Sequence, residues 1–388
     1  MTDFIRRILF FQVLLVFLLC VTVLSCQREP NSQAGLPHFV IENHKIRDKE
    51  DLSSHFQALT IEVDGATSAR IPGVTRNFAY TDSTLFLIYP QRNNQIVAVD
   101  LDGNIKWDLV ADSDPLTSFS SLSAYHFDLE NQEINVFDDQ KHRIYVYDFM
   151  GEHLRTEEIP TIYINDFFLL PTGERLFSTN AMLNTFEDNQ DKTALVAYFA
   201  GNNTATPDQI LLKNPFYDPN RIRFSDTHDF FRDGQGNTFY HRDFGDTLFQ
   251  IQNMVAVPRL TYSYAENDKR RQVLTDPKSN PIILANFLEG NIPYSNFIGL
   301  LADDYLLKSY TYNRKEYFTM IDLDKHETVF NTELFQCNGK HFSGRLDYSS
   351  GVLLNQMYAG NYQQLNGQQR NDDEFEDSSL IYTILTPK

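Results

Sequence analysis

The stretch QIVAVDLDGNIKWDL, residues 95–109, decides the fold of this chain. An alternating apolar run leads into an Asp-apolar-x-Gly turn, and a second run follows the turn. Alternation with a period of two is typical of a β-strand with one buried face. Glycine suits a tight turn because such a turn requires positive φ. The stretch therefore predicts a β-hairpin with Gly103 in its turn.

The same hairpin recurs along the chain. RIYVYDFMGEHLRTEEI, residues 143–159, places Gly151 in the turn, and three weaker copies place Gly201, Asn253 and Lys325 there. From the second copy onward, two further strand-like runs precede each hairpin, such as SLSAYHFDL and INVFDD. Four strands repeated roughly every fifty residues, with almost no helical periodicity, predict an all-β fold of the β-propeller type.

The two ends of the chain indicate how the ring closes. HFSGRLDY, GVLLNQMY and LIYTILTPK supply only three strands for the last blade, which would leave an exposed edge. The strand-like run FQALTIEVDG, residues 56–65, has no blade of its own. We therefore predict that residues 51–388 form one six-bladed propeller in which this N-terminal strand completes the last blade, with five or seven blades as alternatives. The predicted blades span 72–110, 120–160, 161–214, 222–264, 294–335 and 338–388, with insertions near 265–293 and 360–378.

Residues 1–25 have the features of an export signal. Arg6 and Arg7 precede an apolar run from Ile8 to Leu24 that only Gln12 and Thr22 interrupt. A basic start, an apolar middle and a small residue near the end are typical of a secretory signal peptide. Because a run of this length is close to the minimum for crossing a bilayer, an uncleaved membrane anchor is the alternative.

The end of that run indicates a lipid anchor. Val23-Leu24-Ser25-Cys26 resembles the lipobox of bacterial lipoproteins, in which the cysteine is lipidated and becomes the first residue of the mature chain. The resemblance implies that Cys26 carries acyl chains such as palmitate, which bind the protein stably to a lipid bilayer. Residues 26–50 are then the lipidated cysteine and its tether. We expect an exported lipoprotein of the bacterial outer membrane and leave open whether it faces the periplasm or the cell surface.

A second resemblance concerns the fold. In FYHRDFGDTLFQIQNMVAVPRL, residues 239–260, Asp246-Thr247 opens a strand and Pro258-Arg259 introduces the next one. This arrangement resembles a hallmark of bacterial six-bladed β-propeller lipoproteins, within the wider group of NHL-like propellers. That group consists mostly of binding scaffolds, together with some lyases and lactonases, so the resemblance implies the fold and says little about function.

Composition excludes some partners. The full chain has a formal net charge of −19. Removing residues 1–25, which carry two arginines and one aspartate, makes the mature chain one unit more negative. So acidic a protein is not expected to bind nucleic acid. Only Cys337 remains in the folded part, so no intramolecular disulfide can form. We expect a monomer.

The innermost strand of each propeller blade lines the central channel, and the starts of these strands form its rim. The repeat assigns six polar residues to this rim: Asn77, His126, Asp166, His228, Asn296 and His341. Three histidines and an aspartate around one axis could hold a divalent metal. The simpler interpretation is that rim residues are polar because they meet water, so we predict no cofactor.

Two classes of function are consistent with these features. We favour a membrane-anchored extracytoplasmic binding or scaffold protein, whose channel mouth takes a peptide, a glycan or another envelope protein. The alternative is a metal-dependent hydrolase or lyase of the lactonase-like propeller type, using His126, His228 and His341. The sequence has no Gly-x-Ser-x-Gly motif, which would mark a serine hydrolase.

Overall fold

The computed structural model describes residues 35–388 except 42–45, 160–163, 180–193, 200–207, 214–229, 242–245, 265–293, 368–378 and gaps of one to three residues. The chain divides into two compact units, Met1–Pro37 and His38–Lys388, and the fold described below is that of the second unit. Within the described ranges, no helix is both long and apolar enough to cross a membrane. The predicted signal peptide and Cys26 lie outside the described residues.

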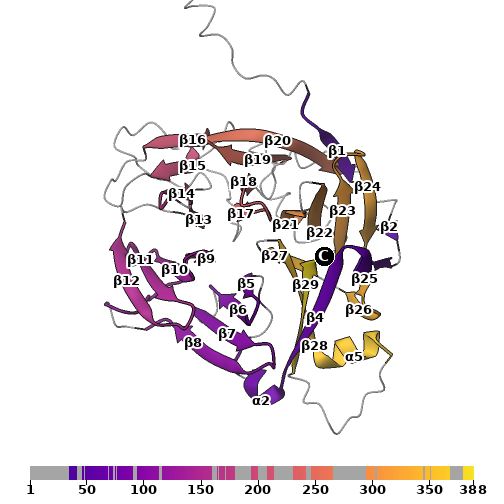
Figure 1. Ribbon diagram of the computed structural model, residues 1–388, viewed down its shortest axis with the longest axis horizontal. Coiled ribbons are helices and arrows are strands. Elements are labelled where there is room, and N and C mark those ends of the chain that lie inside the picture. The colour runs from indigo at the N-terminus through magenta and orange to yellow at the C-terminus, as the bar shows by residue number, and fades with distance from the viewer. Residues whose placement is uncertain are drawn as a thin grey trace, which may run out of the picture. The chain divides into compact units, whose positions relative to one another are not determined.

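The described residues of the second unit form seven small sheets, which are arranged in a ring (Figure 1). Five of the sheets contain four strands that are consecutive in the chain and antiparallel to their neighbours, and we name them blades 1 to 5. Blade 1 comprises β5 (Asn77–Thr81), β6 (Thr84–Tyr89), β7 (Gln95–Asp100) and β8 (Ile105–Val110). Blade 2 comprises β9 (Ala124–Asp128), β10 (Glu133–Asp138), β11 (Arg143–Asp148) and β12 (His153–Glu158). Blade 3 comprises β13 (Asp166–Leu169), β14 (Arg175–Ser178), β15 (Ala194–Phe199) and β16 (Gln209–Lys213).

Blades 4 and 5 continue the same pattern. Blade 4 comprises β17 (Phe230–Arg232), β18 (Thr238–His241), β19 (Thr247–Gln252) and β20 (Val255–Tyr264). Blade 5 comprises β21 (Tyr294–Leu301), β22 (Tyr305–Tyr312), β23 (Lys315–Asp322) and β24 (Glu327–Thr332). Several middle strands are buried on both faces, as in β6, where all six residues are buried, whereas β19 is only partly buried. A strand enclosed between two neighbouring blades is mostly apolar, and the sequence TLFLIY of β6 has this composition.

Blade 6 confirms the predicted closure. Its strands are β27 (Leu346–Ser349), β28 (Val352–Tyr358) and β29 (Leu380–Pro387), and the fourth strand is the N-terminal β4 (Phe56–Val63). β4 is antiparallel to β29 over eight residue pairs, from Leu380↔Val63 to Pro387↔Phe56. The first and last strands of the propeller therefore share one sheet.

The residues before β4 form more structure than a tether. β1 (His38–Ile41) pairs in parallel with β20, β2 (Ile46–Arg47) with β24, and β3 (Glu50–Asp51) with β25 (Leu334–Cys337). We call residues 38–51 the strap. The tether predicted over 26–50 was thus too long, because alternating apolar residues in HFVI already form a strand at His38.

The seventh sheet is also a departure from the prediction. It contains β3, β25 and β26 (Lys340–Ser343), and β25 and β26 lie between blades 5 and 6 in the sequence. The predicted strand HFSGRLDY is divided between β26 and β27. The predicted insertion 360–378 begins as helix α5 (Ala359–Leu365), whereas 368–378 and the insertion 265–293 lie outside the described residues.

The repeat glycines have a packing role as well as a turn role. Gly103 has φ +87°, and a Cβ atom there would lie 2.0 Å from the carbonyl oxygen of Glu62 in β4. Gly151 has φ +83°, and its Cβ would lie 3.1 Å from the ring of Trp107 in β8. The Trp107 indole N–H donates to the carbonyl of Phe149 at 3.1 Å. Each of these turns therefore packs against the outermost strand of the preceding blade.

Candidate functional site

The first strands of the six blades, β5, β9, β13, β17, β21 and β27, are called the inner strands. β9 contacts β13, β13 contacts β17, β21 contacts β27, and β27 contacts β5. Four of the six predicted rim residues lie on these strands. Asn77 opens β5 and Asp166 opens β13, while His126 is the third residue of β9 and Asn296 the third of β21. His228 lies outside the described residues.

Asp166 links the beginnings of two inner strands. Its side chain is buried, with 2 % of the residue exposed. One carboxylate oxygen accepts the N–H of Phe167 at 2.9 Å, and the other accepts the N–H of Phe230 in β17 at 3.1 Å. Because backbone N–H groups stabilise a carboxylate, Asp166 holds blades 3 and 4 together at this end of the inner strands.

Asn77 is also buried, with 3 % of the residue exposed. Its backbone N–H donates to the Thr75 hydroxyl at 3.2 Å, and the Thr75 N–H donates to the side-chain oxygen of Gln356 in blade 6 at 3.0 Å. The Asn77 side-chain oxygen accepts no hydrogen bond from the described part of the chain. Asn77 thus offers an acceptor next to the connection between the first and last blades.

His126 was predicted to face the channel, but its ring packs between blades 2 and 3. The ring centroid lies 4.6 Å from that of Phe168 and 6.3 Å from that of Phe167, both in β13. β9 begins at Ala124, two residues before the strand start predicted at His126.

His341 was assigned to the wrong strand. It lies in β26 of the three-stranded sheet, where its backbone N–H donates to the Asn366 side-chain oxygen at 2.8 Å. Lys49 Nζ lies 3.4 Å from the His341 Nε2 atom. The polar residue that sequence reasoning missed on the inner strand of blade 6 is Asp347, which is 5 % exposed. Gly344 between the two strands was the available signal, since glycine inside a strand pattern often marks an interruption.

The predicted metal set includes His228, which lies outside the described residues, so the set as a whole stays a prediction. Within the part of the chain that the structure describes, no group of three His, Cys, Asp or Glu residues could hold a metal ion. What these inner strands do provide is hydrogen-bonding capacity. Burial raises the pKa of Tyr125, and the charges of Asp166 and Asp347 raise it further, so this phenol stays protonated at neutral pH and can donate a hydrogen bond.

The other ends of the inner strands are joined by Tyr348 of β27. Its hydroxyl lies 3.0 Å from the Leu300 carbonyl and 3.3 Å from the Arg232 carbonyl, in position to donate to either. A Cβ atom at Gly299 would lie 2.7 Å from the Tyr348 ring, so glycine is required there. Tyr348 thereby connects blade 6 to both blade 4 and blade 5.

Arg232 is the last residue of β17 and lies at the same end of the inner strands as Tyr348. Its guanidinium carbon is 4.9 Å from the centroid of the Phe168 ring, and one N–H donates to the Leu169 carbonyl at 3.1 Å. Burial lowers the pKa of Arg232, while the charges of Asp128 and Glu130 act in the opposite direction. The guanidinium is therefore a further contact between blades 3 and 4.

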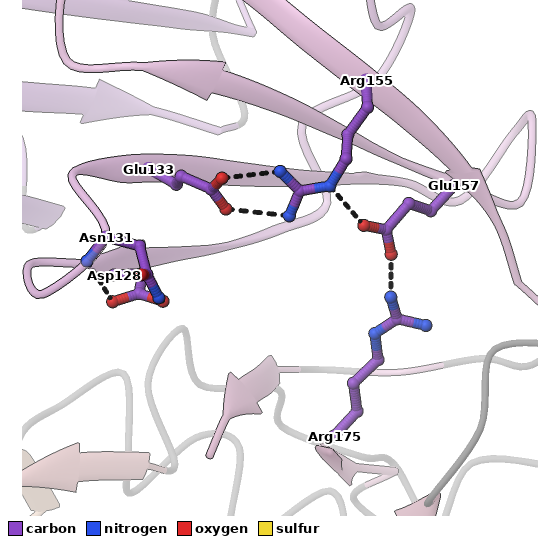
Figure 2. Close-up of polar contacts among 6 residues, drawn as sticks. All are labelled: Asp128, Asn131, Glu133, Arg155, Glu157 and Arg175. Carbon is purple, nitrogen blue, oxygen red and sulfur yellow. Dashed lines mark hydrogen bonds and ion pairs between the residues drawn. The ribbon is translucent and has the colours of Figure 1, made fainter. Parts of the chain in front are cut away.

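Figure 2 shows a chain of charged side chains between blades 2 and 3. Arg155 of β12 binds Glu133 of β10 through two contacts of 2.6 and 2.8 Å and binds Glu157 at 2.8 Å. Glu157 also pairs with Arg175 of β14 in the next blade. Arg155 and Glu157 are two residues apart, so they share one face of β12. This spacing was the feature of the sequence that could have predicted the row of charged side chains. The four side chains alternate in charge, which suits them to holding blades rather than to catalysis.

The ring of short antiparallel sheets defines an all-β propeller. The chain belongs to the six-bladed β-propeller family DUF5128, whose model matches residues 117–349. The family is six-bladed, and the described residues form six blades, two of which carry an added strand (β1 or β2), together with the three-stranded sheet of β3, β25 and β26.

Two solved structures from Bacteroides resemble the chain in fold. One, described as an exported protein of Bacteroides fragilis, has a TM-score of 0.62 at 13 % identity and covers 90 % of this chain and 99 % of its own. The other, a DUF4221 family member from Bacteroides vulgatus, has a TM-score of 0.53 at 13 % identity and covers 86 % and 97 %. No curated protein matches the sequence. At these identities the likeness concerns the fold alone.

Proposed function

We propose that this propeller is a membrane-anchored extracytoplasmic binding or scaffold protein, which holds a ligand or partner where the inner strands begin. The observation that carries the proposal is the set of buried polar side chains on four inner strands: Asn77, Tyr125, Asp166 and Asp347. They supply an amide, a phenol and two carboxylates, which are groups that fix the orientation of a bound molecule.

The anchoring part of the proposal depends on Cys26. The compact propeller unit begins at His38, so residues 27–37 would be the tether between the lipidated cysteine and the strap. Replacing Cys26 with alanine should release the protein from membranes or leave it with an uncleaved signal. Palmitate labelling that is unchanged in the Cys26→Ala protein would show that the anchor lies elsewhere.

The chemistry of the ligand follows from the polar groups and the net charge. Hydrogen-bonding side chains on a rigid scaffold suit a peptide or a glycan, and the acidic surface disfavours nucleic acid. The enzyme alternative is not part of the proposal, because His126 packs against Phe168 and His341 lies in the three-stranded sheet.

A thermal-shift screen of the mature chain against envelope oligosaccharides and peptides tests the proposal. For any ligand found, Asn77→Ala should weaken binding at least about tenfold, the effect of losing roughly 1.4 kcal/mol of binding free energy. Asp138→Asn is a matched control, because Asp138 is equally buried but bonds to Ser120 and to its own turn in blade 2. Equal losses of affinity in both variants would place the ligand somewhere else.

A further inference from the structure

β1 is an addition to a sheet that is already complete. Blade 4 has its four strands without β1, and β4 alone supplies the strand that blade 6 lacks. The ring would therefore be closed if β1 were absent. A strand that closure does not require can be displaced without opening the propeller.

The register of β1 on β20 and the burial of its side chains define which peptide segments this edge can bind. It runs parallel to β20, in register from His38↔Thr261 to Ile41↔Tyr264. His38 and Val40 face solvent, whereas Phe39 and Ile41 are buried against side chains of blades 4 and 5. The site thus selects an extended segment with two apolar side chains two residues apart.

Specific contacts surround these two side chains. The Phe39 ring stacks on His326, in the β23–β24 turn, with ring centroids 5.2 Å apart. On the solvent side, the two ring nitrogens of His38 lie 2.9 Å from the Thr261 hydroxyl and 3.1 Å from the Ser263 hydroxyl. Backbone pairing supplies affinity in such an arrangement, and the alternating side chains supply selectivity.

The interface between blades 4 and 5, beneath β1, contains several polar side chains. His241 Nε2 lies 2.6 Å from the Tyr262 hydroxyl, and the Lys308 ammonium lies 4.0 Å from the centroid of the Tyr262 ring. Asn331 donates to the Tyr310 hydroxyl at 2.7 Å, while its own side-chain oxygen has no hydrogen-bond partner in the described residues although it is fully buried. An unsatisfied buried acceptor costs free energy. Burial of Asn331 therefore stabilises the interface between blades 4 and 5 less than burial of an apolar side chain would.

We propose that the outer edge of β20 at Thr261–Tyr264 is a strand-acceptor site for an extended peptide segment of a partner protein, and that β1 occupies this site within the same chain. The partner segment carries an aromatic and then an aliphatic side chain two residues apart. It adds to blade 4 as a parallel fifth strand, as β1 does. This site is separate from the ligand site proposed where the inner strands begin.

Competition with β1 determines the affinity for the partner. A segment can bind only in the fraction of molecules in which β1 has left, so its apparent dissociation constant is the intrinsic value divided by that fraction. Anything that weakens β1 should therefore strengthen binding of the segment, and anything that fixes β1 should abolish it.

A labelled peptide with the sequence of residues 36–43, LPHFVIEN, is a suitable probe. It should bind the mature chain carrying Phe39→Ser and Ile41→Ser at least about tenfold more tightly than the wild-type chain, as measured by fluorescence anisotropy. Val40→Ser, on the exposed face of β1, should leave binding at the wild-type level. A peptide with serine in place of Phe39 and Ile41 should not bind.

A locked variant keeps the test valid if the double substitution disturbs folding. His38→Cys with Thr261→Cys places two cysteines at directly paired positions of β1 and β20. When oxidised, this protein should not bind the peptide, and reduction should restore binding to the wild-type level. Failure of the peptide to bind the double variant, or binding that the lock does not prevent, overturns the proposal.

Discussion

β4 and β1 are both N-terminal strands added to the outside of a blade, but they differ in what they complete. β4 pairs over eight residues with β29 and has Phe56, Ile61 and Val63 buried in two cores. β1 pairs over four residues with β20 and buries only Phe39 and Ile41. β4 closes the ring, whereas β1 covers a blade that already has its four strands. Position in the sequence therefore says little about structural importance, which depends on whether an edge would otherwise be left open.

Truncation should give the largest contrast between the two strands. Deleting residues 27–63 removes β4, whose three buried side chains Phe56, Ile61 and Val63 contribute about 1.5–3 kcal/mol each, so the loss is comparable to the whole stability of a typical domain. We expect no cooperative unfolding transition by calorimetry. Deleting 27–45 removes β1 and should leave a folded protein with a lower Tm. Equal Tm values for the two truncations would contradict closure by β4.

A single glycine should reveal how tightly β4 is enclosed. In Gly103→Ala the new Cβ would meet the Glu62 carbonyl of β4 at 2.0 Å, and the residue would also have positive φ. We expect a loss of about 3 kcal/mol or more in the free energy of unfolding, measured by urea denaturation. Gly173→Ala is the matched control, because φ is +89° there but nothing lies within 4 Å. It should cost only about 1–2 kcal/mol.

A core substitution in β1 should have a smaller effect than its burial suggests. Phe39→Ala removes a side chain that is 3 % exposed, and such changes in a core cost about 3–5 kcal/mol. We expect about 2 kcal/mol by urea denaturation, because a short edge strand can detach instead of leaving a cavity. Val40→Ala, at a position 43 % exposed, should change stability by less than about 0.5 kcal/mol. A loss of 4 kcal/mol or more for Phe39→Ala would show that β1 is integral to the fold.

Acid should lower the free energy of unfolding slightly, and by the same amount in the wild-type chain and in the chain that lacks β1. Burial alone would raise the pKa of Asp138, but hydrogen bonds from Ser120, Lys141 and Ser121 bring it below the ordinary value of 3.8. A carboxyl group with a lowered pKa in the folded state stabilises the fold above its unfolded pKa, and the contribution is lost as pH falls through the folded pKa. Stability should therefore decrease below about pH 4.

Because Asp138 lies in blade 2, the decrease should be the same in the wild-type chain and in the chain lacking residues 27–45. Urea denaturation at pH 6 and pH 3 measures it. A decrease confined to the wild-type chain would mean that the acid-sensitive contacts belong to β1 instead.

The ring and its closure could be predicted from the sequence because they depend on patterns that physics enforces locally. A hairpin needs alternation and a turn residue such as Gly103, and a final blade of three strands needs a fourth. The strap could not be predicted in this way. β2 and β3 are two residues long, and they exist only because the edges of β24 and β25 lie beside them.

The candidate site was less predictable than the fold, because it depends on register. Asn77 and Asp166 were placed at strand starts, where the structure has them. For His126, the predicted strand start lay two residues beyond the real one at Ala124. For His341, Gly344 was treated as part of a strand, so β26 and β27 were merged and Asp347 was overlooked.

The junction between β8 and the turn at Gly151 has a practical consequence. Trp107 is the only tryptophan in the chain, and its indole touches the turn of the next blade through the Gly151 backbone and the Phe149 carbonyl. Intrinsic emission excited at the red edge of protein absorption therefore comes from one known place. A red shift of that emission would report water entering between blades 1 and 2. The fluorescence of the unlabelled chain can therefore be used to follow the separation of these two blades.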